Sequence, residues 1–99
     1  MLHIINKSPF ERNTLDSCLR VVQPGNSLLL IEDAVYAAVK DNAIADKISK
    51  ASKIVKVYVL GPDLEARGMK DAAVDGVTLV DYGGFVDLVA KHSVVQSWL

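Results

Sequence analysis

The residue with the clearest reactive potential is Cys18, the only cysteine in the chain. A thiolate can act as a nucleophile or carry sulfur, and a nearby cation such as Arg12 or Arg20 favours that ionised form. On a helical wheel Cys18 lies at the margin of the apolar stripe that includes Leu15. Two interpretations therefore stay open: a small buried hydrophobe, which is a common role of free cysteine, or a reactive sulfur carrier.

The other residue types that perform chemistry form no recognisable constellation. His3 and His92 are far apart in sequence and have no cysteine or histidine cluster around them, so we expect no metal site. We predict that His3 lies in a strand at an edge or interface, and that His92 complements the dipole of the last helix. The serines lack a nucleophile-elbow context, and no glycine-rich nucleotide motif is present, so no cofactor is expected.

The stretch from Ser27 to Val39 is predicted to organise the fold. Its apolar run is typical of a strand buried on both faces, and its alanine-rich second half favours a helix. We predict that Asp33 caps this helix, and that Asp63 and Asp81 cap two later ones. Ligands and partners meet open α/β sheets at the carboxyl ends of central strands, so we place the working edge near Asp33.

Strands and helices are predicted to alternate along the chain. Strands are expected at 2–6, 27–31, 54–60 and 77–80, and helices from 8 to about 22 and at 33–39, 43–51, 63–67 and 82–91. The first helix has a start signature at Ser8 and a competing start at Asn13. This alternation predicts one domain over residues 1–99, a three-layer α/β/α sandwich with a small, mostly parallel sheet of four or five strands.

Composition and charge narrow the partners. Hydrophobic residues make up 51% of the chain, which is more than a small monomer readily buries and favours a lasting protein–protein interface. The net charge of −1, without blocks of like charge, gives no reason to expect direct binding of nucleic acid or of an anionic membrane. There is no signal-peptide pattern and no apolar stretch long enough to span a bilayer, so we expect a cytoplasmic protein.

The chain ends in an apolar tail from Ser93 to Leu99. Aromatic residues often anchor interfaces, so the tail is interpreted either as a subunit contact or as a segment folded over its own sheet. The candidate interface residues are Phe10, Tyr36, Val95 and Trp98.

Several stretches, in their order and spacing, resemble the DsrH/TusB family: residues 1–10, 28–39, 57–68, 80–92 and 96–99. These are the smallest subunits of sulfur-relay complexes in the DsrE/DsrF-like superfamily, and the resemblance implies a small parallel α/β fold. It also implies a heterohexamer with DsrE/TusD-like and DsrF/TusC-like subunits, in which the DsrE/TusD-type subunit carries the main persulfide-forming cysteine. Sulfur would pass to a small carrier protein of the DsrC/TusE kind.

The resemblance leaves the role of the chain open. Cys18 and the residues around it, 8–20, look closest to the DsrH branch, so intracellular sulfur oxidation is the main expectation, with Cys18 as candidate carrier. The alternatives are a TusB-like relay for 2-thiolation of the tRNA wobble uridine and a non-catalytic assembly subunit. A weaker option is a homo-oligomer that binds a small ligand near Asp33 and Asp81. Many relatives have glycine where this chain has Ala34, and a turn of positive φ there would be strained.

Overall fold

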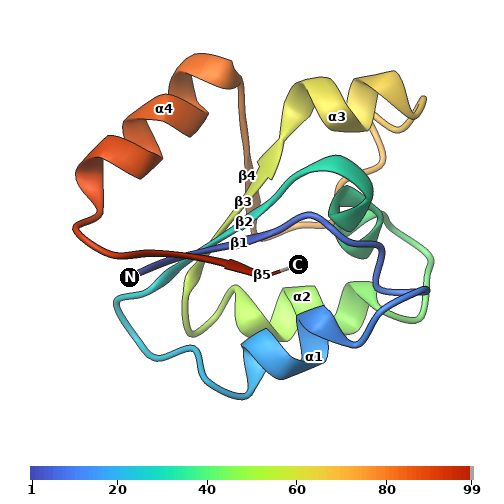
Figure 1. The fold of residues 1–99 in the computed structure, drawn as a ribbon. Helices are drawn as coiled ribbons and strands as arrows, with labels where there is room; N and C mark the ends of the chain where they lie inside the picture. Colours follow the sequence, from blue (N-terminus) through green and yellow to red (C-terminus); the bar gives the residue numbers. More distant parts are fainter. Residues whose placement is uncertain (99) are drawn as a thin grey trace.

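The computed structural model describes residues 1–98, which form a five-stranded sheet with helices on both faces (Figure 1). The strands are β1 (Leu2–Ile5), β2 (Ser27–Leu30), β3 (Lys56–Leu60), β4 (Val77–Val80) and β5 (Val95–Trp98). Their order is β4-β3-β2-β1-β5, and every neighbouring pair is parallel. The predicted α/β fold is confirmed, and the apolar tail supplies the fifth strand. Leu99, the last residue of that tail, lies outside the described residues.

The helices lie in two layers. They are α1 (Thr14–Leu19), the 3₁₀ helix η1 (Glu32–Ala38), α2 (Ala45–Ala51), α3 (Gly61–Ala66) and α4 (Tyr82–Lys91). In Figure 1, α1 and α2 lie below the sheet and α3 and α4 above it. Because the strands are parallel, the carboxyl ends of β1, β2 and β3 lie together at one end of the sheet and their amino ends lie at the other. These two ends are called the carboxyl edge and the amino edge.

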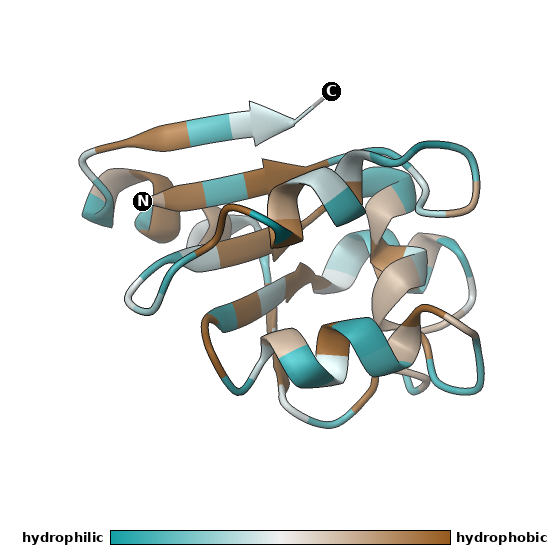
Figure 2. Cartoon of the chain, turned by 90° about the horizontal axis from the view of Figure 1, so that it is seen from below, coloured by the Kyte–Doolittle hydropathy of each residue, from teal (hydrophilic) through white to brown (hydrophobic). Residues whose placement is uncertain are grey.

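The core is largest between the sheet and the α1–α2 layer. Successive side chains of a strand point to opposite faces, and Leu28 and Leu30 face Cys18 of α1 and Ile48 of α2 in the main cluster. Leu29 belongs instead to a smaller cluster under α4. All of β2 is buried, as its continuous apolar run predicted. Figure 2 shows the apolar colour concentrated in the strands, whereas the connecting loops are mostly hydrophilic.

The first helix begins at the later of the two predicted starts. α1 starts after Asn13, although the Asn13 side chain makes no capping bond. The prediction of a helix from Ser8 is wrong. The Ser8 hydroxyl accepts a hydrogen bond from the Phe10 backbone N–H at 3.2 Å, and this local bond supports a turn in place of a helix.

Only one of the three predicted aspartate caps is correct. The Asp81 carboxylate accepts a hydrogen bond from the Gly84 backbone N–H at 2.8 Å and caps α4. The predictions for Asp33 and Asp63 are wrong, because η1 and α3 each begin one or more residues earlier and place both aspartates inside the first turn. Acids in a first turn still complement the helix dipole, so the residue type was appropriate but its position was not.

The backbone strain expected at Ala34 lies two residues earlier. Glu32 has φ of +50°, while Ala34 is not among the residues with positive φ. A non-glycine residue in the left-handed region costs on the order of 1–3 kcal/mol, which the surrounding structure must offset. The turn after β2 is therefore strained at Glu32, and alanine at position 34 is tolerated.

Candidate functional site at the carboxyl edge

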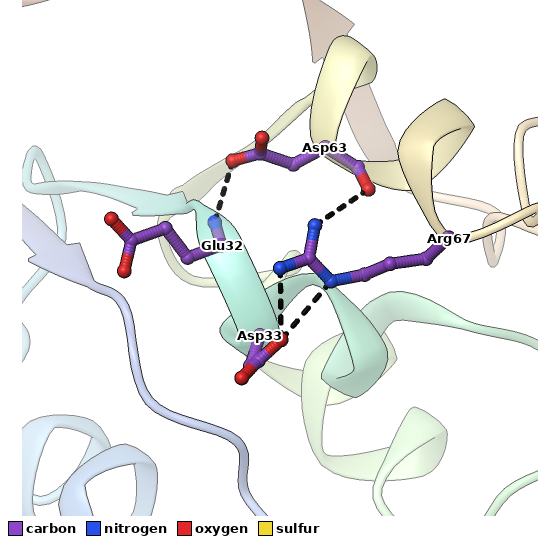
Figure 3. Close-up of polar contacts among 4 residues, drawn as sticks. All are labelled: Glu32, Asp33, Asp63 and Arg67. Carbon is purple, nitrogen blue, oxygen red and sulfur yellow. Dashed lines mark hydrogen bonds and ion pairs between the residues drawn. The ribbon is translucent and has the colours of Figure 1, made fainter.

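Four charged residues meet where β2 and β3 end (Figure 3). The Arg67 guanidinium donates through Nε and Nη2 to Oδ1 of Asp33, at 3.1 and 2.8 Å, and through Nη1 to the Asp63 backbone carbonyl at 3.0 Å. The backbone N–H of Glu32 donates to Oδ2 of Asp63 at 2.6 Å. The site thus joins η1 to α3, two segments separated by more than thirty residues in sequence.

Arg67 is the centre of this arrangement. Its side chain is 22% exposed and that of Asp33 is 56% exposed. The pKa of Arg67 is raised by its hydrogen bond to Asp33, against the opposing effect of burial, and by the charges of Asp33, Asp63 and Tyr36. The guanidinium carbon also lies 6.0 Å from the centre of the Tyr36 ring. Because the ion pair is partly solvated, we assign it no more than about 1 kcal/mol.

The strained turn at Glu32 is held by the bond to Asp63, and its own carboxylate is exposed. Figure 3 draws that carboxylate pointing away from the other three residues. The site contains no nucleophile, and no group of three or more potential ligands within residues 1–98 could hold a metal ion. The hydrogen bonds fix the carboxylates of Asp33 and Asp63 in place at this edge.

Asn6 extends this edge to β1. It follows β1 directly, and its Oδ1 is buried without a hydrogen-bond partner among the described residues. Buried polar atoms are nearly always satisfied, so this enclosed oxygen is an exception among the described residues. The sequence did not single out Asn6 or Arg67. Nothing local marks either residue, because their setting arises only when the strands pair.

Cys18 lies elsewhere, in the core between α1 and the sheet. Its side chain is 0% exposed. Burial raises the pKa of the thiol to about 12, and no charged neighbour opposes that shift. The sequence predicted that Arg12 or Arg20 would lower this pKa. Both side chains are exposed, and neither contributes to the pKa of Cys18. This geometry agrees with the packing interpretation of Cys18; its role as a sulfur carrier stays a prediction.

The tail is bound to its own sheet through Trp98. Trp98 Nε1 donates to Nδ1 of His3 at 3.1 Å, and the other ring nitrogen of His3 lies 3.2 Å from Oδ1 of Asn26. Because Nδ1 accepts, the proton of a neutral His3 sits on Nε2. The prediction of His3 at an edge or interface is wrong, since β5 covers the outer side of β1 and leaves His3 only 3% exposed.

The candidate interface residues fall into two groups. Phe10 and Val95 are 60% and 39% exposed, respectively, and remain open to a partner. Tyr36 and Trp98 are half-buried, the first beside Arg67 and the second against the main core. Tyr36 and Trp98 therefore already contribute to the fold of the single chain.

The setting of His92 weakens its predicted interaction with the dipole of α4. His92 is the C-cap residue, and its pKa is lowered by burial, by the charge of the amino terminus and by Lys91. A lowered pKa disfavours the imidazolium. The cation in the last turn of α4 that complements the helix dipole is Lys91. None of the helices within residues 1–98 has the length and apolar character needed to cross a membrane.

Comparison with known proteins gives a consistent relationship. A family model described as DsrH like protein matches residues 7–95. The TusB proteins of Pectobacterium parmentieri and Escherichia coli are 39% and 37% identical to this chain, over 99% of it and 100% of their own length.

Solved structures agree on the fold. The ychN protein from E. coli has a TM-score of 0.82 at 18% identity, covering 98% of this chain and 97% of its own. A protein of unknown function from Methanobacterium thermoautotrophicum has a TM-score of 0.73 at 18% identity, covering 97% and 95%. At this identity the two structures support the fold alone.

Proposed function

The chain belongs to the DsrH/TusB family, and on that premise we propose that it is a subunit of a cytoplasmic sulfur-relay complex of related small α/β chains. The observation that carries this proposal is the similarity to TusB proteins, which covers 99% of this chain and 100% of theirs. A relationship that spans both chains supports a shared role more strongly than a shared fold does.

Within that complex we assign the chain an assembly role. Persulfide sulfur passes when a thiolate attacks a sulfur atom, so each carrier needs an accessible, ionisable thiol. Cys18 is fully buried, and its pKa is raised to about 12. The persulfide-forming cysteine is then expected on a DsrE/TusD-like subunit, while this chain shapes the complex around it.

The surface proposed for sibling subunits is the outer side of α4. Only Leu88 of this helix is buried. Tyr82 and Val86 are 63% and 64% exposed, and Val89 is 37% exposed. Contiguous exposed apolar residues mark interaction surfaces on small proteins. We propose that a DsrE/TusD-like or DsrF/TusC-like subunit covers this surface, with Phe10 and Val95 as further contact residues.

The carboxyl edge is proposed as the docking site for the DsrC/TusE-like carrier protein. Glu32 and Asp33 present acidic groups there, the Asp63 carboxylate accepts from the Glu32 backbone N–H, and Arg67 pairs with Asp33. The matching partner surface would present lysine or arginine side chains.

The pathway proposed first is 2-thiolation of the tRNA wobble uridine, because the full-length relatives are TusB proteins. Sulfur oxidation, the first expectation from sequence, becomes the second candidate. It is favoured by the cysteine in the first helix and by the DsrH-like family model. Measuring 2-thiolated uridine in tRNA from cells that lack the gene separates the two pathways. Only the tRNA-thiolation pathway predicts that the modified uridine is lost in these cells.

Assembly is tested by co-expression with the sibling subunits, followed by size-exclusion chromatography and native mass spectrometry. We expect a stoichiometric complex. Val86→Asp places a charge on the α4 surface and should disrupt the complex while leaving the thermal midpoint of the isolated chain nearly unchanged, because Val86 is exposed. Val21→Asp is the matched control, since Val21 is 52% exposed and lies after α1.

Two results would contradict these proposals separately. If no sibling co-purifies with the wild-type chain, the relay-subunit proposal is wrong. If the siblings assemble equally well with both variants, the proposed α4 interface is wrong while the subunit role stands.

A further inference from the structure

A hollow of about 400 Å³ opens at the amino edge of the sheet, opposite the carboxyl site. It is lined by residues 25–27 at the start of β2, by residues 52–56 between α2 and the first residue of β3, by Tyr58 and by Lys91 and His92 at the end of α4. Figure 1 shows the end of α4 and the turn before β2 on the same side of the molecule as the N-terminus.

The hollow is lined by cations without partners. Lys53, Lys56 and Lys91 line it, and no acidic residue does so among the described residues. None of the three ammonium groups has an ion pair or hydrogen bond within residues 1–98, whereas Lys47 is paired with Asp16 at 2.8 Å. In a chain with net charge −1, this local excess of positive charge attracts an anion.

Ser27 also lines the hollow. The residue is 5% exposed, and no hydrogen bond within the described residues uses its hydroxyl group. Its hydroxyl oxygen is not among the enclosed side-chain atoms that lack a partner, so it is open to solvent. The hydroxyl can therefore donate a hydrogen bond to a ligand oxygen in the hollow.

The pKa of His92 agrees with a positive local charge. This pKa is lowered first by burial, then by the positive charges of the amino terminus and of Lys91. The neutral imidazole still carries one N–H donor. It can therefore donate a hydrogen bond to an anion without adding a fourth positive charge.

We propose that this hollow binds a small oxyanion of the phosphate type, either free or as the head group of a small molecule. Lys53, Lys56 and Lys91 neutralise its charge, and the Ser27 hydroxyl donates to one of its oxygens. The competing explanation is that lysines merely complement the carbonyl ends of α2 and α4, which terminate at this edge. That explanation fits Lys53 and Lys91 but does not account for Lys56, the first residue of β3, which lines the same hollow.

The test is a titration of the ¹⁵N-labelled full chain with inorganic phosphate, followed by amide chemical shifts at constant ionic strength set with chloride. We expect saturable shifts at Ser27, Lys56 and His92. Lys53→Gln combined with Lys56→Gln should weaken binding about tenfold or more, because hydrogen bonds to charged groups are the strong ones. The matched control is Lys40→Gln with Lys70→Gln, two exposed lysines outside the hollow that change the net charge equally.

A second variant and a second ligand sharpen the test. Ser27→Ala should weaken phosphate binding several-fold while leaving the chain folded, as judged by its thermal midpoint. A titration with ribose 5-phosphate distinguishes the free ion from the head group of a small molecule. Tighter binding than that of inorganic phosphate assigns the hollow to a phosphate ester, and equal binding assigns it to the free ion. Absence of saturable shifts in the wild-type chain, or equal weakening by both double-lysine variants, would overturn the proposal.

Discussion

Alkylation of Cys18 tests whether its thiol is available to chemistry. Burial raises the pKa of this thiol from 9.0 to about 12. At pH 7.5, well below both values, the thiolate fraction changes tenfold for each unit of pKa, so it falls about a thousandfold. The complete burial of the side chain blocks the reagent as well. We therefore expect iodoacetamide to label the native chain at least about a thousandfold more slowly than the unfolded chain.

The assay follows the mass of the intact chain over time, in buffer and in concentrated guanidinium. The unfolded chain is the control, because it contains the same single thiol without burial. A native rate within about tenfold of the unfolded rate would show that the thiol is exposed and would refute the reasoning from burial.

The same thiol should make stability depend on pH in the alkaline range. The folded-state pKa is raised, so the neutral thiol favours the fold, and this contribution is fully present below pH 9. It is lost as pH rises from 9 toward 12, because the unfolded chain then ionises more readily. At pH 10.5 the loss is about 2 kcal/mol. Urea unfolding at pH 8 and pH 10.5 should show this loss of unfolding free energy for the wild type and a smaller loss for Cys18→Ala.

Three further changes probe the fold around the two edges. Trp98→Phe should destabilise the chain by about 1–3 kcal/mol in urea unfolding, because it leaves Nδ1 of His3 buried and unpaired; an unchanged midpoint would contradict that bond. Asp81→Ala removes the cap that accepts from Gly84 and should cost about 1 kcal/mol, while Asp81→Asn should retain most of it. Arg67→Gln should cost no more than about 1 kcal/mol, because the ion pair is partly solvated, and a larger loss would show that the guanidinium is needed to hold the strained turn.

The sheet was predictable from sequence because its signals are local. Four strands carry continuous apolar or β-branched runs, and the alternation with helices implies parallel pairing. The sequence did not place the fifth strand, because Val95, Gln96 and Ser97 are all exposed and the strand depends on pairing with β1. The helix starts at Ser8 and Asp33 were mistaken for a related reason. A polar side chain suited to capping can equally form a turn or an ion pair, and the choice depends on neighbours distant in sequence.

The candidate site was predictable in place but not in composition. The carboxyl end of β2 was expected to be the working edge, and the charged cluster lies there. Arg67 was not foreseen, because its partner Asp33 stands 34 positions away and only the pairing of β2 with β3 brings them together. Cys18 was foreseen as the residue of interest, yet spacing alone could not decide between surface and core. Cys18 lies at the margin of the apolar stripe on the helical wheel, and it is buried because the sheet packs against that side of α1.

The most direct test of the assembly role is mass spectrometry of the complex after incubation with a sulfur donor. The complete set of sibling subunits is present, and each cysteine is examined for the mass of one added sulfur atom. The account predicts that Cys18 stays unmodified while a sibling subunit carries the persulfide, and that Cys18→Ser leaves sulfur transfer intact. An added sulfur on Cys18 that disappears in Cys18→Ser, together with loss of transfer, would contradict it.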